Sequence, residues 1–328
     1  MKIAVLGVGR IGAMHADLIE NRVEGASVAG VFDVFDDAAA NVAARLGVPM
    51  FTSIDEALAG DADAVAICTS TPTHVDLMIQ AAGAGKAIFC EKPVSLDLDE
   101  VDRGLVAVSQ AGVPLHIGFN RRFDPSHAAV QAAVAAGEVG DLRQMHISSR
   151  DPEPPPIDYV KVSGGIFLDM TIHDFDMARF VTGSEVVEVY ATGSVTVDSG
   201  IGDVGDFDTV TVLLTHENGT VTTIDNCRQS AFGYDQRVEA FGSKGMVTSE
   251  NHTATSTVKR TAKGSAGDVV PHFFLERYIP SYLKQWEQFI AAVESGSTTP
   301  VTGADGRAPL VIGLAAKKSA ATNQPVRV

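Results

Sequence analysis

The sequence predicts an α/β domain with a doubly wound parallel sheet, followed by an α+β domain with a large, mainly antiparallel open sheet. The first prediction depends on apolar strand patterns that alternate with helical patterns over residues 1–120. The second depends on successive strand patterns without helices between them, from Leu142 to Glu250. A chain of 328 residues is long enough for two domains, which we place at residues 1–120 and 121–328.

The composition, 45% hydrophobic and 20% charged residues, is that of a soluble globular protein. The formal net charge of −16 argues against a nucleic acid or an anionic membrane as partner. No apolar run approaches the roughly 20 residues of a membrane span, and the N-terminus lacks the apolar core of a signal peptide. The three cysteines, Cys68, Cys90 and Cys227, cannot form an even disulfide framework, so we expect a cytoplasmic protein.

The strand pattern Lys2–Leu6 is followed by the motif G-x-G-x-x-G and then by a helical pattern. This order is typical of a dinucleotide-binding Rossmann domain. The first glycine permits a tight turn, the second lets the backbone approach a pyrophosphate, and the third lets the helix pack closely on the strand. The helix start offers unpaired N–H groups to the phosphates. The motif residues expected to contact the cofactor are Gly7, Gly9, Arg10, Ile11 and Gly12.

A second strand pattern, Ser27–Phe32, ends at Asp33, roughly 20 residues beyond the last glycine, where an acid accepts hydrogen bonds from ribose hydroxyls. A carboxylate at that place repels a 2′-phosphate. No Arg or Lys in Val34–Asp37 offsets this repulsion. The sequence therefore predicts NAD as cofactor rather than NADP. The alternative is a glycine turn with an incidental aspartate.

The alternation of helices and strands continues to Ile117, which favours one parallel sheet. The expected helices cover residues 36–46, 54–59, 73–82 and 98–111, and the expected strands cover residues 64–68, 87–90 and 114–117, with a short strand near 50–51. In such sheets ligands bind at the carboxyl ends of the strands.

Two strand ends carry further candidate residues. The strand ending at Cys68 is followed by a hydroxyl-rich helix start suited to phosphate and ribose contacts, with Thr69, Ser70, Pro72 and His74. Within it, His74 is favoured as a helix-start residue over a catalyst. The strand ending at Cys90 is followed by Glu91-Lys92-Pro93. Lys92 could bind a hydroxyl oxygen and stabilise alkoxide character, or it could be an ordinary surface lysine.

The third strand end, after Ile117, carries Asn120, Arg121 and Arg122. The two arginines could serve the cofactor, the substrate or ion pairs between the domains, and their spacing does not choose among these roles.

The segment Gly164–Phe180 contains a pattern that is apolar nearly all round, which predicts a buried helix over Ile166–Phe180. Asp169 and His173 stand at i and i+4 in this helix and would share one face. An oriented Asp–His pair is a common way to make a general base. The alternative for this spacing is a structural ion pair.

The remaining strand patterns belong to the second domain and cover residues 142–149, 186–197, 207–215, 220–226, 236–242 and 246–250. Residues 251–267, rich in Thr, Ser and Gly, predict a strand edge and a loop. A helical pattern at 274–294 contains Pro280 and a core residue, Trp286, and a final helix at 305–321 is expected to pack near the first domain. One face of the open sheet would remain exposed in a monomer, so we expect it to pack on another subunit.

These motifs together resemble the Gfo/Idh/MocA family of oxidoreductases. The matching segments are GVGRIGAMHA at 7–16, EKPVSLD at 91–97, GFNRRFDP at 118–125 and GGIFLDMTIHDFDM at 164–177. Within the family, the wording DMTIHDFD is most similar to inositol dehydrogenases. The segment after Arg150, with the proline-rich Asp151–Pro156, departs from the related pattern and leaves Asp151 and Tyr159 without a role.

The resemblance implies a nicotinamide-dependent dehydrogenase with Lys92, Asp169 and His173 as catalytic residues and no metal. It also implies cofactor contacts at Glu91, Lys92 and Asn120, and a homotetramer assembled through the open sheet. The residues expected to contact the substrate are Lys92, Arg121, Asp169, His173 and Tyr234.

The sequence thus predicts NAD-dependent oxidation of a secondary hydroxyl of a cyclic polyol, foremost myo-inositol to 2-keto-myo-inositol. Other inositol isomers or an aldose such as glucose are the alternatives within the same chemistry. A metal-dependent hydrolase would need histidine ligands at defined spacing, which the sequence lacks. A non-catalytic NAD sensor could dispense with Lys92, Asp169 and His173, all of which are present.

Overall fold

The computed structural model describes residues 1–328, and the chain divides into two compact units. Unit 1 comprises residues 1–120 and 281–308, and unit 2 comprises residues 121–280 and 309–328. Assigning the whole of 121–328 to the second domain was therefore wrong for residues 281–308. The physical reason is apolar packing, because Trp286, Phe289 and Ile290 belong to the hydrophobic core of unit 1.

Unit 1 contains a five-stranded sheet in the order β2-β1-β3-β4-β5, with every neighbouring pair parallel. The strands are β1 (Lys2–Leu6), β2 (Ser27–Phe32), β3 (Ala64–Ile67), β4 (Ala87–Cys90) and β5 (Leu115–Ile117). Strands β3, β4 and β5 are buried along their whole length, which explains their continuous apolar runs. The predicted parallel sheet is confirmed. The short strand expected near Met50 is a single bridge to Val31.

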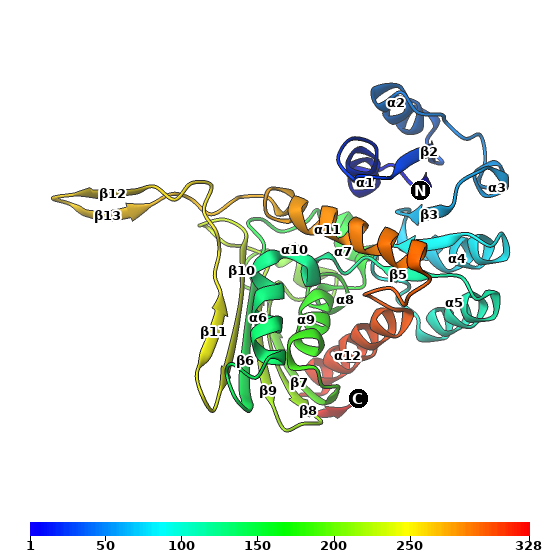
Figure 1. Ribbon diagram of the computed structural model, residues 1–328. Helices are drawn as coiled ribbons and strands as arrows, with labels where there is room; N and C mark the ends of the chain where they lie inside the picture. The colour runs from blue at the N-terminus through cyan, green and yellow to red at the C-terminus, as the bar shows by residue number, and fades with distance from the viewer. The chain divides into compact units, whose positions relative to one another are not determined.

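Helices alternate with these strands along the chain (Figure 1). They are α1 (Arg10–Asn21), α2 (Asp36–Leu46), α3 (Ile54–Ala59), the 3-10 turn η1 (Thr71–Thr73), α4 (His74–Gly83) and α5 (Leu98–Ala111). Local sequence sets the ends of α5. Asp97 accepts hydrogen bonds from the N–H groups of Asp99 and Glu100, and Gly112 ends the helix in the left-handed conformation.

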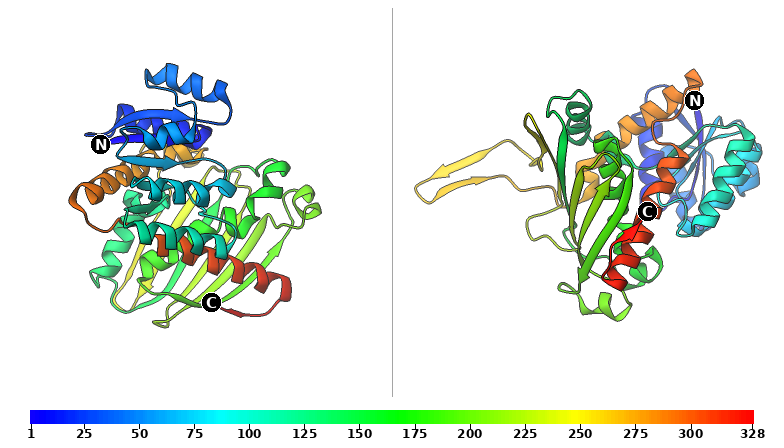
Figure 2. Two further views of the ribbon diagram at one scale, coloured as in Figure 1. Left: turned by 90° about the vertical axis from the view of Figure 1, so that its right-hand side faces the viewer. Right: turned by 90° about the horizontal axis from the view of Figure 1, so that it is seen from below.

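Unit 2 contains a seven-stranded sheet in the order β11-β10-β6-β9-β8-β7-β14, seen in two orientations in Figure 2. The strands are β6 (Leu142–Arg150), β7 (Val186–Ser194), β8 (Thr209–His216), β9 (Val221–Cys227), β10 (Asp235–Gly242), β11 (Met246–Ser249) and β14 (Val326–Arg327). Only β6 and β9 are parallel neighbours, so the predicted mainly antiparallel sheet is confirmed. β6 and β9 therefore end at the same edge, where the antiparallel β10 begins.

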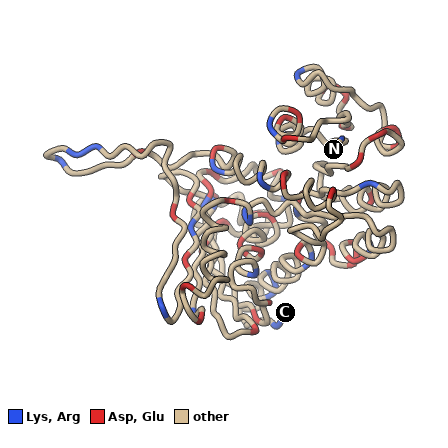
Figure 3. The backbone as a smooth tube through the Cα atoms, in the orientation of Figure 1, with Lys and Arg blue, Asp and Glu red and all other residues tan.

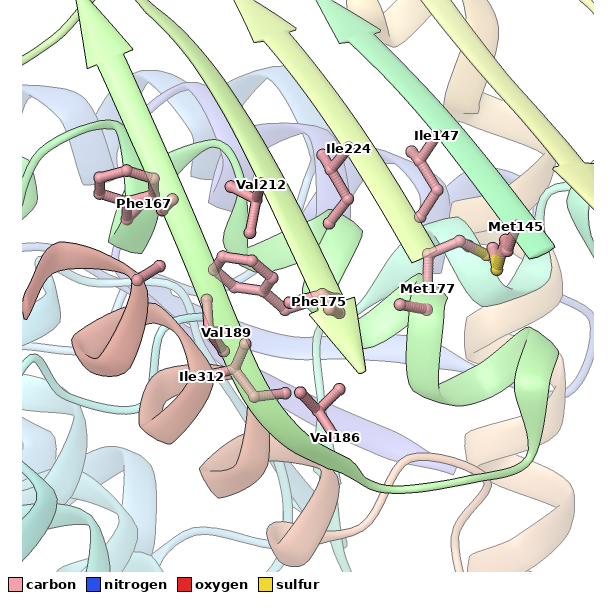
Figure 4. Packing of buried hydrophobic residues seen from close by; sticks show 14 of the residues in the cluster. Met145, Ile147, Phe167, Phe175, Met177, Val186, Val189, Val212, Ile224 and Ile312 are labelled. Atoms are coloured by element: carbon pink, nitrogen blue, oxygen red, sulfur yellow. The ribbon is translucent and has the colours of Figure 1, made fainter. Parts of the chain in front are cut away.

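Helices cover one face of this sheet and form the main core of unit 2. They are α6 (Pro125–Ala135), α8 (Ile166–Asp169), α9 (Ile172–Thr182) and the second part of α12 (Gly303–Thr322). Figure 4 shows Phe175 of α9 and Ile312 of α12 lying against Val189 and Val212 of the sheet. Short helices α7 (Ile157–Ser163) and α10 (Ser199–Asp203) and the 3-10 turn η2 (Asn120–Phe123) lie in connections.

Two long helices carry the chain from one unit to the other. α11 (Phe274–Ser295) crosses the boundary after Pro280, and α12 crosses it before Pro309. Each helix therefore has a proline at the crossing, where a backbone hydrogen-bond donor is missing. The final helix, expected at 305–321, lies mostly in unit 2.

Two segments differ from the sequence-based predictions. The expected helix over Ile166–Phe180 is two helices, α8 and α9, separated at Met170 and Thr171. Residues 251–267 contain a separate antiparallel hairpin of β12 (Val258–Thr261) and β13 (Gly264–Gly267), which is not part of the seven-stranded sheet.

Candidate cofactor and active-site residues

The glycine motif of unit 1 has a steric requirement at two of its positions. Gly7 adopts a φ of +83°, and a Cβ atom added there would lie 2.6 Å from the backbone nitrogen of Thr69. A Cβ atom added to Gly12 would lie 1.8 Å from the carbonyl oxygen of Gly7. The turn and the first turn of α1 can approach this closely only because both residues lack side chains. These positions therefore shape the turn itself.

Gly9 differs, because a Cβ atom added there would meet no protein atom within 4 Å. Gly9 is the N-cap residue of α1, and the helix has neither a side-chain cap nor an acidic residue in its first turn. A helix N-terminus presents backbone N–H groups to its surroundings, so the start of α1 can receive an anionic group. The space beside Gly9 is what the approach of a pyrophosphate requires.

Asp33 has a structural task that its position in the sequence did not reveal. Its Oδ2 atom accepts a hydrogen bond of 2.7 Å from the N–H of Val8, and Oδ1 accepts one of 3.0 Å from the N–H of Phe35. The carboxylate thus ties the end of β2 to the glycine turn. Each carboxylate oxygen can accept more than one hydrogen bond, so the same group can also bind ribose hydroxyls.

The segment after β3 is held by its own side chains. The hydroxyl groups of Thr69 and Thr73 are 2.7 Å apart, and Thr73 donates to the carbonyl of Ser70 at 2.8 Å. Pro72 lies in η1, between these residues. His74 is buried, and its Nδ1 and Nε2 atoms lie 2.9 Å and 3.0 Å from the carbonyl oxygens of Pro93 and Thr69.

His74 therefore connects the loops that follow β3 and β4, because its two ring nitrogens lie beside the backbone carbonyl oxygens of Thr69 and Pro93. Burial lowers its pKa, and the two carbonyl contacts oppose this shift. The environment is that of a structural histidine, in agreement with its interpretation as a helix-start residue rather than a catalyst.

Glu91 is positioned by two residues whose role the sequence did not indicate. The indole N–H of Trp286 donates to Nδ1 of His15 at 2.9 Å. Because an indole nitrogen can only donate, Nδ1 of His15 is an acceptor and Nε2 carries the proton. Nε2 then donates to Oε1 of Glu91 at 2.7 Å. Trp286, predicted to be a core residue, also stacks on Phe89 of β4 with 4.3 Å between the ring centroids.

This chain of contacts fixes the loop that carries Lys92. The backbone N–H of Lys92 donates to Oε2 of Glu91 at 3.2 Å, and Lys92 is partly exposed directly beyond β4. A Cβ atom on Gly118 would lie 2.8 Å from the same Glu91 oxygen, so Gly118 leaves room for the carboxylate. Glu91 therefore acts in this structure as the support of Lys92.

Asn120 has a buried side-chain nitrogen that finds no acceptor in the protein. The residue is 3% exposed, and its Nδ2 atom has no hydrogen-bond partner. A buried donor without an acceptor calls for a ligand atom or a water molecule. Together with the space at Gly9 and the helix start of α1, this donor fits a bound dinucleotide.

In unit 2, two glycines with positive φ precede α8, Gly164 at +88° and Gly165 at +84°. A Cβ atom on Gly165 would lie 2.7 Å from a carboxylate oxygen of Asp206. That carboxylate accepts hydrogen bonds of 3.0 and 3.1 Å from the N–H of Ile166, at the start of α8. The glycines therefore allow a side-chain cap to approach the helix start.

The interruption between α8 and α9 is made by Thr171. Its backbone N–H bonds to the carbonyl of Ile166, five residues earlier, and its hydroxyl donates to Oδ1 of Asn226 at 2.6 Å. The next N–H groups bond three residues back, from His173 to Met170 and from Asp174 to Thr171. Asp169 and His173 are consequently not separated by a regular helical turn, so the prediction of one continuous helix through both residues was wrong.

Asn226, at the end of β9, connects both sides of this interruption. It accepts from Thr171, and its Nδ2 donates to Oδ2 of Asp174 at 2.8 Å. Asn226, Thr171 and Asp174 are each at most 1% exposed. His173 lies between the two anchored residues and is itself partly exposed. The anchors therefore fix the backbone that presents the histidine.

Asp169 is held by two side chains. Its Oδ1 accepts a hydrogen bond of 2.8 Å from the hydroxyl of Tyr159, and its Oδ2 accepts one of 3.3 Å from Nη1 of Arg228. Arg228 is 1% exposed and also lies 3.8 Å from a carboxylate oxygen of Asp206. The sequence left Tyr159 without a role, and Arg228 was not considered, because long-range contacts of this kind have no sequence signal.

Arg121, predicted to contact the substrate, lies in a buried polar network. Its Nη1 donates to Oδ1 of Asp174 at 2.8 Å and to Ser149 at 3.0 Å, and its Nη2 donates to the hydroxyl of Tyr234 at 3.3 Å. Burial raises the pKa of Asp174, and Arg121 opposes this shift. Arg122 forms a bidentate pair with Asp176, at 2.9 and 2.6 Å. In the structure the two arginines thus anchor α9.

Asp151 lies directly after β6, at the sheet edge where Arg228 follows β9 and Tyr234 precedes β10. Burial raises the pKa of Asp151 to about 6, while Arg228 and Arg121 lower it and Asp169 raises it. This edge of unit 2 therefore gathers ionisable and hydroxyl groups, suited to binding a hydroxyl-rich ligand.

Two glycine substitutions should separate cofactor binding from folding. Gly9→Ala introduces no clash, so the thermal unfolding midpoint should stay unchanged while the dissociation constant for NADH rises about tenfold, a change of about 1.4 kcal/mol. Gly12→Ala should lower the thermal unfolding midpoint and also raise the dissociation constant for NADH. Gly83→Ala, in α4 with open space around it, is the control. Equal NADH affinity in Gly9→Ala and the wild type would contradict this assignment.

Comparison with known proteins matches both halves of the chain to one family of oxidoreductases. Residues 1–119 match the GFO_IDH_MocA oxidoreductase family with an NAD-binding Rossmann fold, and residues 127–248 match the GFO/IDH/MocA C-terminal domain. A myo-inositol 2-dehydrogenase of Thermotoga maritima is 46% identical over 100% of this chain and 98% of its own length.

Two solved structures have the same fold. A myo-inositol dehydrogenase of Corynebacterium glutamicum has a TM-score of 0.96 and 40% identity, covering 100% of this chain and 98% of that chain. A scyllo-inositol dehydrogenase of Lactobacillus casei, solved with NAD(H) and scyllo-inositol, has a TM-score of 0.93 and 28% identity over the same shares of the two chains.

None of the helices has the length and apolar character of a membrane-spanning segment. The chain belongs to the Gfo/Idh/MocA oxidoreductase family and is an NAD-dependent dehydrogenase.

Proposed function

We propose that this enzyme oxidises the secondary hydroxyl at C2 of myo-inositol to the ketone, with NAD as hydride acceptor. The observation that carries the proposal is the anchored Asp169, held by Tyr159 and Arg228 and followed four residues later, beyond the helix interruption, by the partly exposed His173. Identity of 46% over the whole chain to a myo-inositol 2-dehydrogenase supports this choice of substrate.

We assign a role in the reaction to three residues of the chain. His173 takes the proton of the reacting hydroxyl, and Asp169 favours the charged form of the imidazole. The ammonium of Lys92 binds the reacting oxygen and stabilises its developing negative charge. NAD, when bound, supplies the acceptor for the hydride. The glycine motif, Asp33 and Asn120 would bind the NAD molecule. Asp151, Arg121 and Tyr234 lie at the polar edge that would receive the other ring hydroxyls.

The assembly and the compartment are part of the proposal. We expect a homotetramer in which the uncovered face of the seven-stranded sheet packs on another subunit, because only one face carries helices. We expect the cytoplasm, since Cys68, Cys90 and Cys227 are all free thiols. Burial raises the pKa of Cys68 and Cys90 well above the ordinary value, which keeps both protonated and unreactive.

The substrate is tested by NADH formation with myo-, scyllo- and chiro-inositol and common aldoses, using NAD and NADP in parallel. The expected result is the highest kcat/KM with myo-inositol and a strong preference for NAD. Highest kcat/KM with an aldose would contradict the assignment to inositols. Preference for NADP would contradict the role given to Asp33, since a carboxylate there should repel a 2′-phosphate.

Replacing the proposed base should remove chemistry without removing binding. His173→Ala should lower kcat by about 10²–10⁴-fold, the usual contribution of a general base, with NADH affinity unchanged. His272→Ala, which truncates an exposed histidine of the same unit, is the matched control and should keep wild-type kinetics. A wild-type kcat in His173→Ala would rule out the histidine as the base.

Asn226 should act as a positioning residue through Thr171 and Asp174. Asn226→Ala removes both hydrogen bonds that fix the junction of α8 and α9. We expect kcat to fall about tenfold or more. Thr222→Val, in the same strand, removes a buried contact of 2.9 Å to His216, far from the junction. It should lower the thermal midpoint comparably but leave kcat within about twofold. Equal effects of both substitutions on kcat would show only a general loss of stability.

A further inference from the structure

A fully buried histidine of unit 1 has no role in the reaction proposed above. His15 belongs to α1 and is 0% exposed. Three aromatic rings meet its ring at an angle, those of Phe89, Tyr282 and Trp286, with centroid distances of 5.2, 5.3 and 5.6 Å. Neither ring nitrogen is exposed to water, so each one needs a partner in the protein. The partners are the indole of Trp286 and the carboxylate of Glu91.

Trp286 fixes which nitrogen of His15 carries the proton. Its indole N–H donates to Nδ1 at 2.9 Å, and an indole nitrogen cannot accept. A proton on Nδ1 would place two donors against each other, so the imidazole keeps its proton on Nε2. The indole has a fixed orientation, because it is 0% exposed, stacks on Phe89 at 4.3 Å and meets Phe289 edge-on at 5.7 Å. The tautomer of His15 is therefore set by rigid packing.

Glu91 is the residue that depends on this tautomer. Strands β2 to β5 carry no charged residue, whereas Figure 3 shows acidic and basic residues along the helices of unit 1. Glu91 lies directly beyond β4, with 13% of its side chain exposed. Its Oε1 accepts from Nε2 of His15 at 2.7 Å, and its Oε2 accepts from the backbone N–H of Lys92 at 3.2 Å. A carboxylate in such an apolar setting needs these donors.

The carboxylate of Glu91 has little freedom to find another donor. A Cβ atom on Gly118, directly beyond β5, would lie 2.8 Å from Oε2 and 2.9 Å from Cδ of Glu91. The N–H of Glu91 donates to the carbonyl of Ile67 at 3.0 Å, which fixes the backbone at this strand end. If Nε2 of His15 lost its proton, two acceptors would face each other, and the carboxylate would leave this position.

We propose that His15 is a positioning residue for the dehydrogenase reaction and that Trp286 holds it in the required tautomer. The effect passes from His15 through Glu91 to the backbone N–H of Lys92, whose ammonium binds the reacting oxygen. The inference therefore rests on the role proposed above for Lys92. The position of this loop matters for the rate, because a displacement of about 1 Å at a reacting group can cost about 10²-fold.

Two substitutions of His15 separate positioning from packing. His15→Leu removes the donor, so kcat should fall about tenfold or more while the dissociation constant for NADH stays within about threefold. His15→Gln keeps an uncharged N–H donor for Glu91 and should retain kcat within about threefold of the wild type. The packing control is Phe289→Leu, in the same core. It should lower the thermal unfolding midpoint but keep kcat within about twofold.

Double substitutions test the route through Lys92. Lys92→Met removes the ammonium, so adding His15→Leu to it should lower kcat by less than about twofold further, because both changes act through one group. Trp286→Phe removes the indole N–H and should lower kcat about threefold or more in the wild type. In the His15→Gln background it should have no such effect, since an amide has no second tautomer that must be excluded.

Equal kcat in His15→Leu and His15→Gln, or independent losses in His15→Leu and Lys92→Met, would overturn the proposal. So would an equal effect of Trp286→Phe in the wild type and in His15→Gln, which is the deciding comparison if thermal unfolding shows that His15→Leu does not fold. A wild-type kcat in Lys92→Met would contradict the proposed reaction itself. A wild-type kcat in His15→Leu beside an impaired Lys92→Met would overturn only the role of His15.

Discussion

The guanidinium of Arg228 is the charge on which the proposed active site of unit 2 depends. It is 1% exposed, donates to Asp169 at 3.3 Å and lies near Asp206, whose carboxylate caps α8. A buried cation among carboxylates is stable only as a group, and removal of one partner typically costs about 3–5 kcal/mol. The position of Asp169 and the start of α8 are therefore coupled through a single side chain.

A second group of buried contacts fixes the backbone that carries His173. Thr171 interrupts the helix, Asn226 binds both sides of the interruption, and Arg121 neutralises Asp174. Unit 1 has a comparable series of contacts. Trp286 sets the tautomer of His15, and His15 donates to Glu91. Glu91 in turn accepts from the backbone N–H of Lys92. In both units the residues proposed for chemistry are partly exposed, and buried side chains such as Arg228, Asn226 and Trp286 help to orient them. This division gives reactive groups access to ligand while their orientation remains fixed.

Much of this arrangement could be predicted from the sequence, because it is encoded locally. The alternation of strands and helices, the steric demand for Gly7 and Gly12, and the acid at the end of β2 all depend on residues close in the chain. The helix interruption could not be predicted. Its cause is a hydrogen bond between Thr171 and Asn226, which are 55 residues apart. Likewise, the roles of Tyr159, Arg228 and His15 arise from contacts that no periodicity or spacing records.

The proposed reaction transfers hydride from C2 of myo-inositol to NAD. The most direct measurement uses myo-inositol deuterated at C2 and detects the label in the reduced cofactor by mass spectrometry. We expect one deuterium in each molecule of reduced cofactor formed. Reduced cofactor without deuterium, formed at an appreciable rate from this substrate, would contradict it.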